Sequence, residues 1–113
     1  MNKEPFITIV TVVYNGVQTI EETIISIINQ NYSKFEYIII DGGSTDGTIE
    51  IIEKYREKIS YFISEPDKGI FDAMNKGLLR AKGDWISFIN SGDMFYNSDV
   101  LSSVFLENND FFD

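Results

Sequence analysis

A short apolar run that stops at one carboxylate constrains the fold of this chain more than any other feature. Residues 38–40 are three isoleucines, Asp41 follows them, and the small polar stretch 42–48 leads into a helical pattern. A continuous run of β-branched residues is typical of a parallel strand that is buried on both faces. Ligands of open α/β sheets bind beyond the carboxyl ends of such strands, where Asp41 is expected. A well-capped strand-to-helix loop without a ligand has the same composition, so this stretch alone leaves both interpretations open.

Strand and helix patterns alternate along the whole chain. Strands are predicted at residues 6–13, 35–40, 59–64 and 85–89, helices at 18–29, 49–58, 70–81 and 98–107, and the start of a further strand at 110–113. This order predicts an α/β fold with a mostly parallel sheet and helices on both faces. In the third helix Gly83 is the expected C-terminal glycine. The predicted packing face of that helix consists of apolar residues at helical spacing: Phe71, Met74, Leu78 and Ala81.

The acidic composition and the lack of histidine narrow the chemistry. The 113 residues, enough for one domain, carry a formal net charge of −9 and so do not fit a nucleic-acid partner, which requires clustered Lys and Arg. Without histidine, acid–base or metal chemistry depends on Asp and Glu, and Mg²⁺ or Mn²⁺ are the expected metals. The absence of cysteine, the polar stretch 1–5 and the lack of a span-length apolar run favour a cytoplasmic location.

Three polar loops that carry acids follow predicted strands, at residues 41–48, 65–69 and 90–93. In a parallel sheet all three lie at one edge. The second loop contains Lys68, the only cation in these loops, at a helix start that suits a phosphate. The third loop places Asp93 beside a glycine, where a carboxylate can hold a hard cation. Taken alone, the first two loops are equally compatible with a plain connection, and the composition of residues 90–93 favours a plain turn.

Several common nucleotide and metal motifs are absent. Residues 14–19, after the first strand, lack the G-x-G-x-x-G of a dinucleotide-binding fold, and the chain has no G-x-x-x-x-G-K-[ST]. Residues 41–47 imitate the start of a calcium loop, but Gly43 and Thr45 stand at two of its ligand positions and no Glu closes it. The lack of these motifs argues against a dinucleotide-binding fold, a P-loop and a calcium loop of this kind.

The chain resembles the inverting family 2 glycosyltransferases of the GT-A fold in three ordered segments: ITIVTVVYN, IIIDGGSTDGT and SEPDKGIFDAMNKGLLRAKGDWISFINSGD. The resemblance covers nearly the whole chain and is greatest to bacterial enzymes of polysaccharide, capsule or O-antigen assembly. It implies transfer of a sugar from a nucleotide-sugar donor, commonly a UDP-sugar, to a saccharide or lipid-linked acceptor. A divalent metal, Mn²⁺ or Mg²⁺, would bind the diphosphate.

The resemblance also implies roles for individual residues around the nucleotide. Tyr14 would border it, and Asp41 stands at the position of the family's base-contacting aspartate. Asp67 and Lys68 stand in the loop that flanks the base. One departure is visible here, because the usual second acid after Asp41 is Gly42 in this chain.

The D-x-D metal motif of the family corresponds to residues 90–93. Asp93 would bind the donor and, together with Asn90, the metal. Asp93 is the only carboxylate of this segment, so the resemblance implies a weaker metal site that is shared with waters. This is the second departure from the family pattern.

The catalytic base of the family lies on a segment well downstream of these motifs, and an inverting transfer needs such a base. We therefore expect that residues 1–113 are the N-terminal donor-binding part of an incomplete GT-A domain, cut near the start of its fifth strand, with the base beyond Asp113. The alternative is a non-catalytic nucleotide-binding or interaction module. The open sheet edge of such a chain is expected to promote self-association. Membrane attachment in full-length relatives would come from segments not present here.

Overall fold

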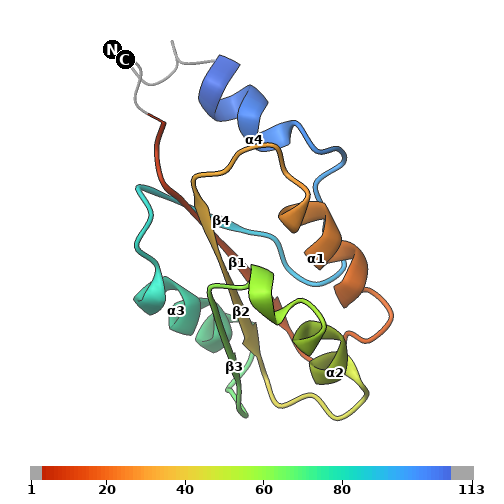
Figure 1. The fold of residues 1–113 in the computed structure, drawn as a ribbon. Helices are drawn as coiled ribbons and strands as arrows, with labels where there is room; N and C mark the ends of the chain where they lie inside the picture. The colour runs from red at the N-terminus through yellow and green to blue at the C-terminus, as the bar shows by residue number, and fades with distance from the viewer. Residues whose placement is uncertain (1–3, 108–113) are drawn as a thin grey trace.

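The computed structural model describes residues 4–107, which contain a four-stranded sheet covered by helices on both faces (Figure 1). The strands are β1 (Ile7–Val13), β2 (Phe35–Asp41), β3 (Tyr61–Ser64) and β4 (Trp85–Phe88). They lie in the order β3-β2-β1-β4, and every pair is parallel. This confirms the predicted α/β architecture. The predicted strand at residues 110–113 lies outside the described residues.

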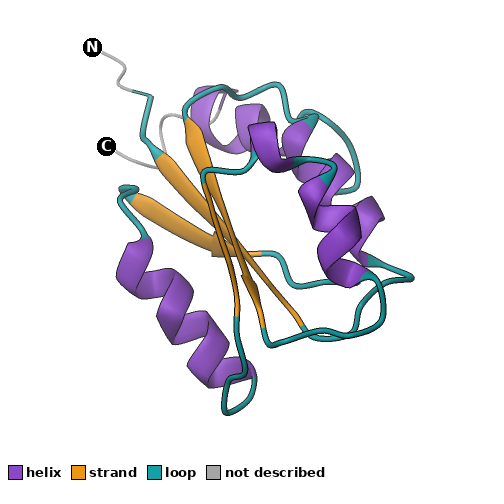
Figure 2. Cartoon of the chain, turned by 60° about the horizontal axis from the view of Figure 1, so that its bottom comes forward, coloured by secondary structure: helices purple, strands orange, loops and turns teal. Residues whose placement is uncertain are grey.

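The helices divide between the two faces of the sheet. Helices α1 (Ile20–Ile28) and α2 (Thr48–Glu53) lie on one side, and α3 (Ile70–Arg80) lies on the other, as Figure 2 shows. A short helix, α4 (Val100–Ser102), continues into a π-helical turn at Ser103–Glu107. No helix within residues 4–107 is long and apolar enough to cross a membrane.

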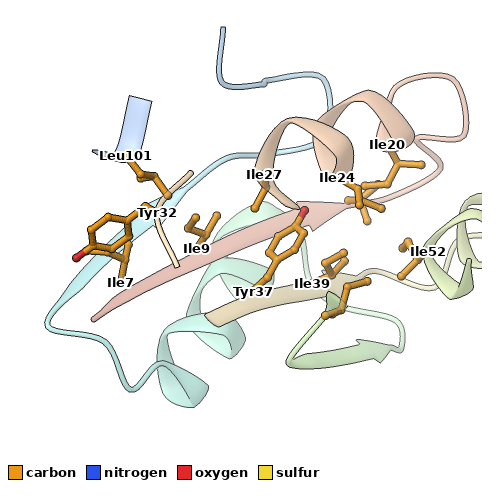
Figure 3. Close-up of a cluster of buried hydrophobic side chains, with 12 residues drawn as sticks. Ile7, Ile9, Ile20, Ile24, Ile27, Tyr32, Tyr37, Ile39, Ile52 and Leu101 are labelled. Atoms are coloured by element: carbon orange, nitrogen blue, oxygen red, sulfur yellow. The ribbon is translucent and has the colours of Figure 1, made fainter. Parts of the chain in front are cut away.

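The two central strands are buried on both faces, as the continuous apolar runs predict. β1 and β2 pair in register from Ile7 with Phe35 to Val13 with Asp41, and every residue of β1 is buried. Alternate side chains of each strand therefore enter different cores. The larger core joins Ile9, Tyr37 and Ile39 to the buried isoleucines of α1 and α2 (Figure 3). The smaller one joins Val10, Val12, Ile38 and Ile40 to Ala73 of α3.

Helix α3 packs on the sheet mainly through small residues. Met74 of the predicted packing face does pack against the smaller core, but the prediction is wrong for Phe71 and Leu78. The side chains of Phe71 and Leu78 are exposed, at 82% and 48%, whereas Ala73 and Gly77 are the buried residues of the helix. A Cβ on Gly77 would lie 2.5 Å from Cγ1 of Val10, so glycine is needed for the close approach of the helix to β1. The close contact between α3 and β1, rather than the spacing of large apolar residues, determines which face of α3 packs on the sheet.

Several predicted helix ends are also corrected. α2 ends at Glu53 and a 3₁₀ turn, Arg56–Lys58, replaces the rest of the helix predicted to residue 58, because the backbone N–H groups of Lys54 and Tyr55 bond three residues back rather than four. The last helix begins at Val100 rather than at residue 98. Gly83 is not a helix cap: a Cβ there would lie 2.6 Å from the backbone N of Thr8, so it permits a chain crossing.

Candidate functional site

The polar loops that follow the strands lie at the carboxyl edge of the sheet, as predicted. Those after β1, β3 and β4 contribute side chains to one cavity, whereas the predicted loop at residues 41–48 contributes none. This cavity, of about 400 Å³, opens beside the start of α3. Its lining includes Tyr14, Asp67 and Asn90, one residue from each loop. Tyr14 stands at the rim with 65% of its surface exposed. The cavity is within the size range of small-molecule sites, and it brings together three of the predicted site residues.

Asp41 is fully buried, and its carboxylate makes its hydrogen bonds inside the protein. Oδ2 accepts hydrogen bonds from the backbone N–H groups of Gly43 and Ser44, at 2.9 and 2.8 Å, and from the Ser64 hydroxyl at 2.7 Å. Oδ1 accepts one from the Ser44 hydroxyl at 2.6 Å. The carboxylate thus ties the loop after β2 to the end of β3. Asp41 does not line the cavity, and this geometry favours a loop-holding role over the contact with a nucleobase that the resemblance implies.

The loop after β1 is held by the loop after β2. The backbone N–H of Asn15 donates to Oγ of Ser44 at 2.7 Å, and Oδ1 of Asn15 accepts from the backbone N–H of Thr45 at 2.9 Å. Asn15 has a φ of 50°, in the left-handed region that asparagine tolerates better than most residues. Asn15 followed by Gly16 is a turn signal in the sequence, but the hydrogen bonds of Asn15 to the loop after β2 are not visible there.

Asp46 of the same loop bonds to Thr48, the first residue of α2. Its Oδ1 accepts hydrogen bonds from the backbone N–H of Thr48 at 3.1 Å and from the Thr48 hydroxyl at 2.6 Å. The hydroxyl, helped by the backbone N–H groups of Val17 and Thr48, holds the pKa of Asp46 below its ordinary value. This acid therefore holds the loop to the start of α2 and does not line the cavity.

In the loop at residues 65–69, Asp67 lines the cavity and Lys68 does not. Oδ1 of Asp67 accepts a hydrogen bond from the backbone N–H of Gly69 at 3.0 Å. Lys68 is exposed, while its backbone N–H donates to Oδ2 of Asp72 at 2.9 Å. Of the two predicted residues of this loop, Asp67 is the one whose position suits a ligand in the cavity.

Residues 90–93 form a turn beside the cavity. The backbone N–H of Asp93 donates to the carbonyl of Asn90 at 2.8 Å, and Gly92 has a φ of 99°, a backbone conformation that favours glycine. The turn interpretation of this segment is thus confirmed, and the turn still leaves its side chains available. Asn90 lines the cavity, whereas Asp93 is exposed and outside its lining.

The turn at residues 90–93 offers a divalent cation two side chains, Asn90 and Asp93, of which Asn90 lines the cavity. Oδ1 of Asn90 is buried and has no hydrogen-bond partner within the described part of the chain. A buried acceptor without a partner is costly, and a cation or a donor group that reached this oxygen would satisfy it. Residues 4–107 hold no group of three or more acidic side chains able to bind a metal. Mg²⁺ commonly takes only one or two carboxylates from the protein and completes its coordination with waters and substrate phosphates. Asp93 is the one carboxylate that this turn offers, and Asn90 adds an amide oxygen.

Helix α1 holds this turn through a hydroxyl that the sequence analysis missed. Oγ1 of Thr23 donates to the carbonyl of Asp93 at 2.7 Å and accepts from the backbone N–H of Gly92 at 3.1 Å. Thr23 is fully buried. Further along the same stripe, Oγ1 of Thr19 lies 2.9 Å from Oγ of Ser91. A polar stripe at helical spacing in the sequence could have indicated this contact. All of its members bond to residues 91–101: Thr19, Thr23, Ser26 and Gln30.

Comparison with known proteins agrees with this geometry. The sequence model of a family described as "Glycosyl transferase family 2" matches residues 8–107. The Bacillus subtilis protein TuaG, described as a putative teichuronic acid biosynthesis glycosyltransferase, is 37% identical over 95 residues, which are 81% of this chain and 38% of TuaG. The chain spans 38–40% of the length of the curated relatives it matches.

Two solved structures have the same fold over most of the chain. S. aureus TarS 1-349 in complex with UDP-GlcNAc matches with a TM-score of 0.80 and 28% identity, over 88% of this chain and 30% of that one. The Pyrobaculum calidifontis mannosyltransferase PcManGT, in complex with GDP-Man and Mn²⁺, matches with a TM-score of 0.81 and 25% identity, over 90% of this chain and 32% of that one.

The parallel sheet, its strand order and the acid-bearing loops at its carboxyl edge define an α/β domain of the GT-A class. Within that class, the chain belongs to glycosyltransferase family 2.

Proposed function

We propose that residues 1–113 are the donor-binding part of an enzyme that transfers a sugar from a nucleotide-diphosphate sugar, with inversion, to a saccharide or lipid-linked acceptor. The observation that carries this proposal is the cavity at the carboxyl edge, which is lined by Tyr14, Asp67 and Asn90 from three different loops. A UDP-sugar donor is supported by the UDP-GlcNAc complex of TarS. A role in assembling a bacterial surface polysaccharide is supported by the description of TuaG.

The residues around the cavity have distinct roles in this proposal. The exposed ring of Tyr14 borders the nucleoside, and Asp67 accepts a hydrogen bond from it. The start of α3, which follows Gly69 in the cavity lining, favours the negative charge of the diphosphate. Asn90 and Asp93 would hold Mn²⁺ or Mg²⁺ with the diphosphate, as the Mn²⁺ complex of PcManGT supports. When bound, this metal neutralises charge on the leaving nucleoside diphosphate.

A non-catalytic nucleotide-binding module is the second candidate. The feature that favours it is the single carboxylate, Asp93, in the segment 90–93, which is the weakest part of the proposed metal site. Such a module would bind the nucleotide through Tyr14 and Asp67 without any need for a metal. The two candidates therefore differ in whether binding depends on a divalent cation.

Thermal unfolding with nucleotides separates these proposals. A ligand at about a hundred times its dissociation constant adds about 2.7 kcal/mol to the free energy of unfolding, which raises the midpoint by about ten degrees in a domain of this size. We expect UDP to stabilise the chain, more so with Mn²⁺ than with EDTA, and NAD to have no effect. Equal stabilisation by UDP with Mn²⁺ and with EDTA would favour the module. No stabilisation by UDP or GDP under either condition would contradict both candidates.

A further inference from the structure

Gly42 lies directly beneath the carboxylate of Asp67. A Cβ on Gly42 would lie 2.8 Å from Oδ2 of Asp67 and 3.3 Å from its Oδ1 and Cγ. Gly42 is buried, and it is not among the glycines with a positive φ, so its backbone does not by itself require glycine. Glycine is therefore needed at this position because it leaves room for the Asp67 carboxylate, and not because of its backbone φ.

The loop that carries Asp67 is fixed from two sides. Oδ1 of Asp67 accepts the hydrogen bond from the backbone N–H of Gly69, and Nζ of Lys76 lies 3.1 Å from Oε1 of Glu65, at the start of the loop. Within the described residues, Oδ2 of Asp67 has no hydrogen-bond donor. Asp67 thus lines the cavity with Oδ1 bonded within its own loop and Oδ2 beside Gly42.

We propose that Gly42 sets the recognition of the donor by leaving room for Asp67, whose Oδ2 accepts a hydrogen bond from the nucleoside. This inference rests on the proposed function. A carboxylate only accepts hydrogen bonds, so the matching group on the nucleoside is a donor: a ring N–H of the base or a ribose hydroxyl. Asp41 is unsuited to this task because its carboxylate already holds the neighbouring loops.

A double-mutant cycle tests this inference by calorimetric titration of UDP in the presence of Mn²⁺. Asp67→Ala is expected to weaken UDP binding about tenfold or more, because a hydrogen bond to a charged group is lost. Gly42→Ala is expected to weaken it by a similar factor, since the new methyl displaces the carboxylate. The double variant should bind UDP no worse than Asp67→Ala alone, because no carboxylate is left to displace. Thermal unfolding of each free variant checks that it is folded.

CDP and 2′-deoxy-UDP distinguish the two sources of the hydrogen-bond donor. If the base supplies it, Asp67→Ala removes the preference for UDP over CDP, which lacks the ring N–H of uracil. If the ribose supplies it, the same variant removes the preference for UDP over 2′-deoxy-UDP. Either loss supports the inference.

Three results would overturn the inference. The first is unchanged affinity and unchanged nucleotide preference in Asp67→Ala while the wild-type chain binds UDP, which leaves the proposed function intact. The second is an equal cost of Gly42→Ala in the wild-type and Asp67→Ala backgrounds. The third is a wild-type chain that binds no nucleotide, which removes the proposed function as well. If Gly42→Ala does not fold, Asp67→Ala and the nucleotide series decide the question.

Discussion

Replacing Asp41 with alanine is expected to lower the free energy of unfolding by about 3 kcal/mol or more, because several buried donors lose their charged acceptor. Those donors are the backbone N–H groups of Gly43 and Ser44 and the hydroxyls of Ser44 and Ser64. Small domains are stable by only about 5–15 kcal/mol, so such a loss removes a large part of the total. Urea denaturation monitored by circular dichroism measures it.

The matched control for this prediction is Asp67→Ala. Asp67 is also an acid at the carboxyl edge, but its one hydrogen bond, to the backbone N–H of Gly69, is at the surface. We expect its removal to change the free energy of unfolding by less than about 1 kcal/mol. If Asp41→Ala were as stable as Asp67→Ala, Asp41 would not be the structural acid of this edge, and its predicted role as a ligand contact would regain support.

Thr23→Val is expected to cost about 2 kcal/mol of stability and to loosen the turn at residues 90–93. Valine has nearly the shape of threonine but cannot bond the backbone N–H of Gly92 or the carbonyl of Asp93, which Thr23 holds at 3.1 and 2.7 Å. Amide hydrogen exchange at Gly92 should therefore become faster than the loss of global stability explains. Urea denaturation and exchange followed by NMR measure the two effects.

Two variants control for the Thr23 prediction. Thr23→Ser keeps the hydroxyl, so it should restore most of the protection of Gly92 even though it loses a buried methyl group. Thr45→Val makes the same chemical change at an exposed threonine and should alter stability by less than about 0.5 kcal/mol. Wild-type exchange at Gly92 in Thr23→Val would show that α1 does not hold the turn.

The fold could be predicted well from the sequence because its central strands carry a strong signal. β1 and β2 are nearly unbroken runs of apolar residues, and only a parallel sheet covered on both faces buries such runs completely. The polar loops at their carboxyl ends followed from the same pattern. The face of α3 could not be predicted, because Gly77 fits closely over Val10 and this distance is not visible in hydrophobic spacing.

The location of the candidate site could be predicted from the sequence, but the role of each acidic residue in it could not. Asp41, Asp67 and Asp93 all follow strands in the sequence, yet the structure encloses the first, turns the second to the cavity and exposes the third. The three acids differ in their hydrogen-bond partners. Asp41, for example, accepts a hydrogen bond from Ser64, which belongs to another strand. Partners brought together by folding cannot be read from the spacing of residues within one loop.

The most direct test of the donor site is a map of amide chemical shifts during titration with UDP and Mg²⁺. We expect the shifts to change first at Tyr14, at Asp67 and at residues 90–93, around the cavity at the carboxyl edge. Another cavity, of about 370 Å³, lies at the opposite edge of the sheet and is lined by Glu36 and Arg80, among others. Changes confined to that second cavity, or no change at saturating UDP and Mg²⁺, would contradict the account.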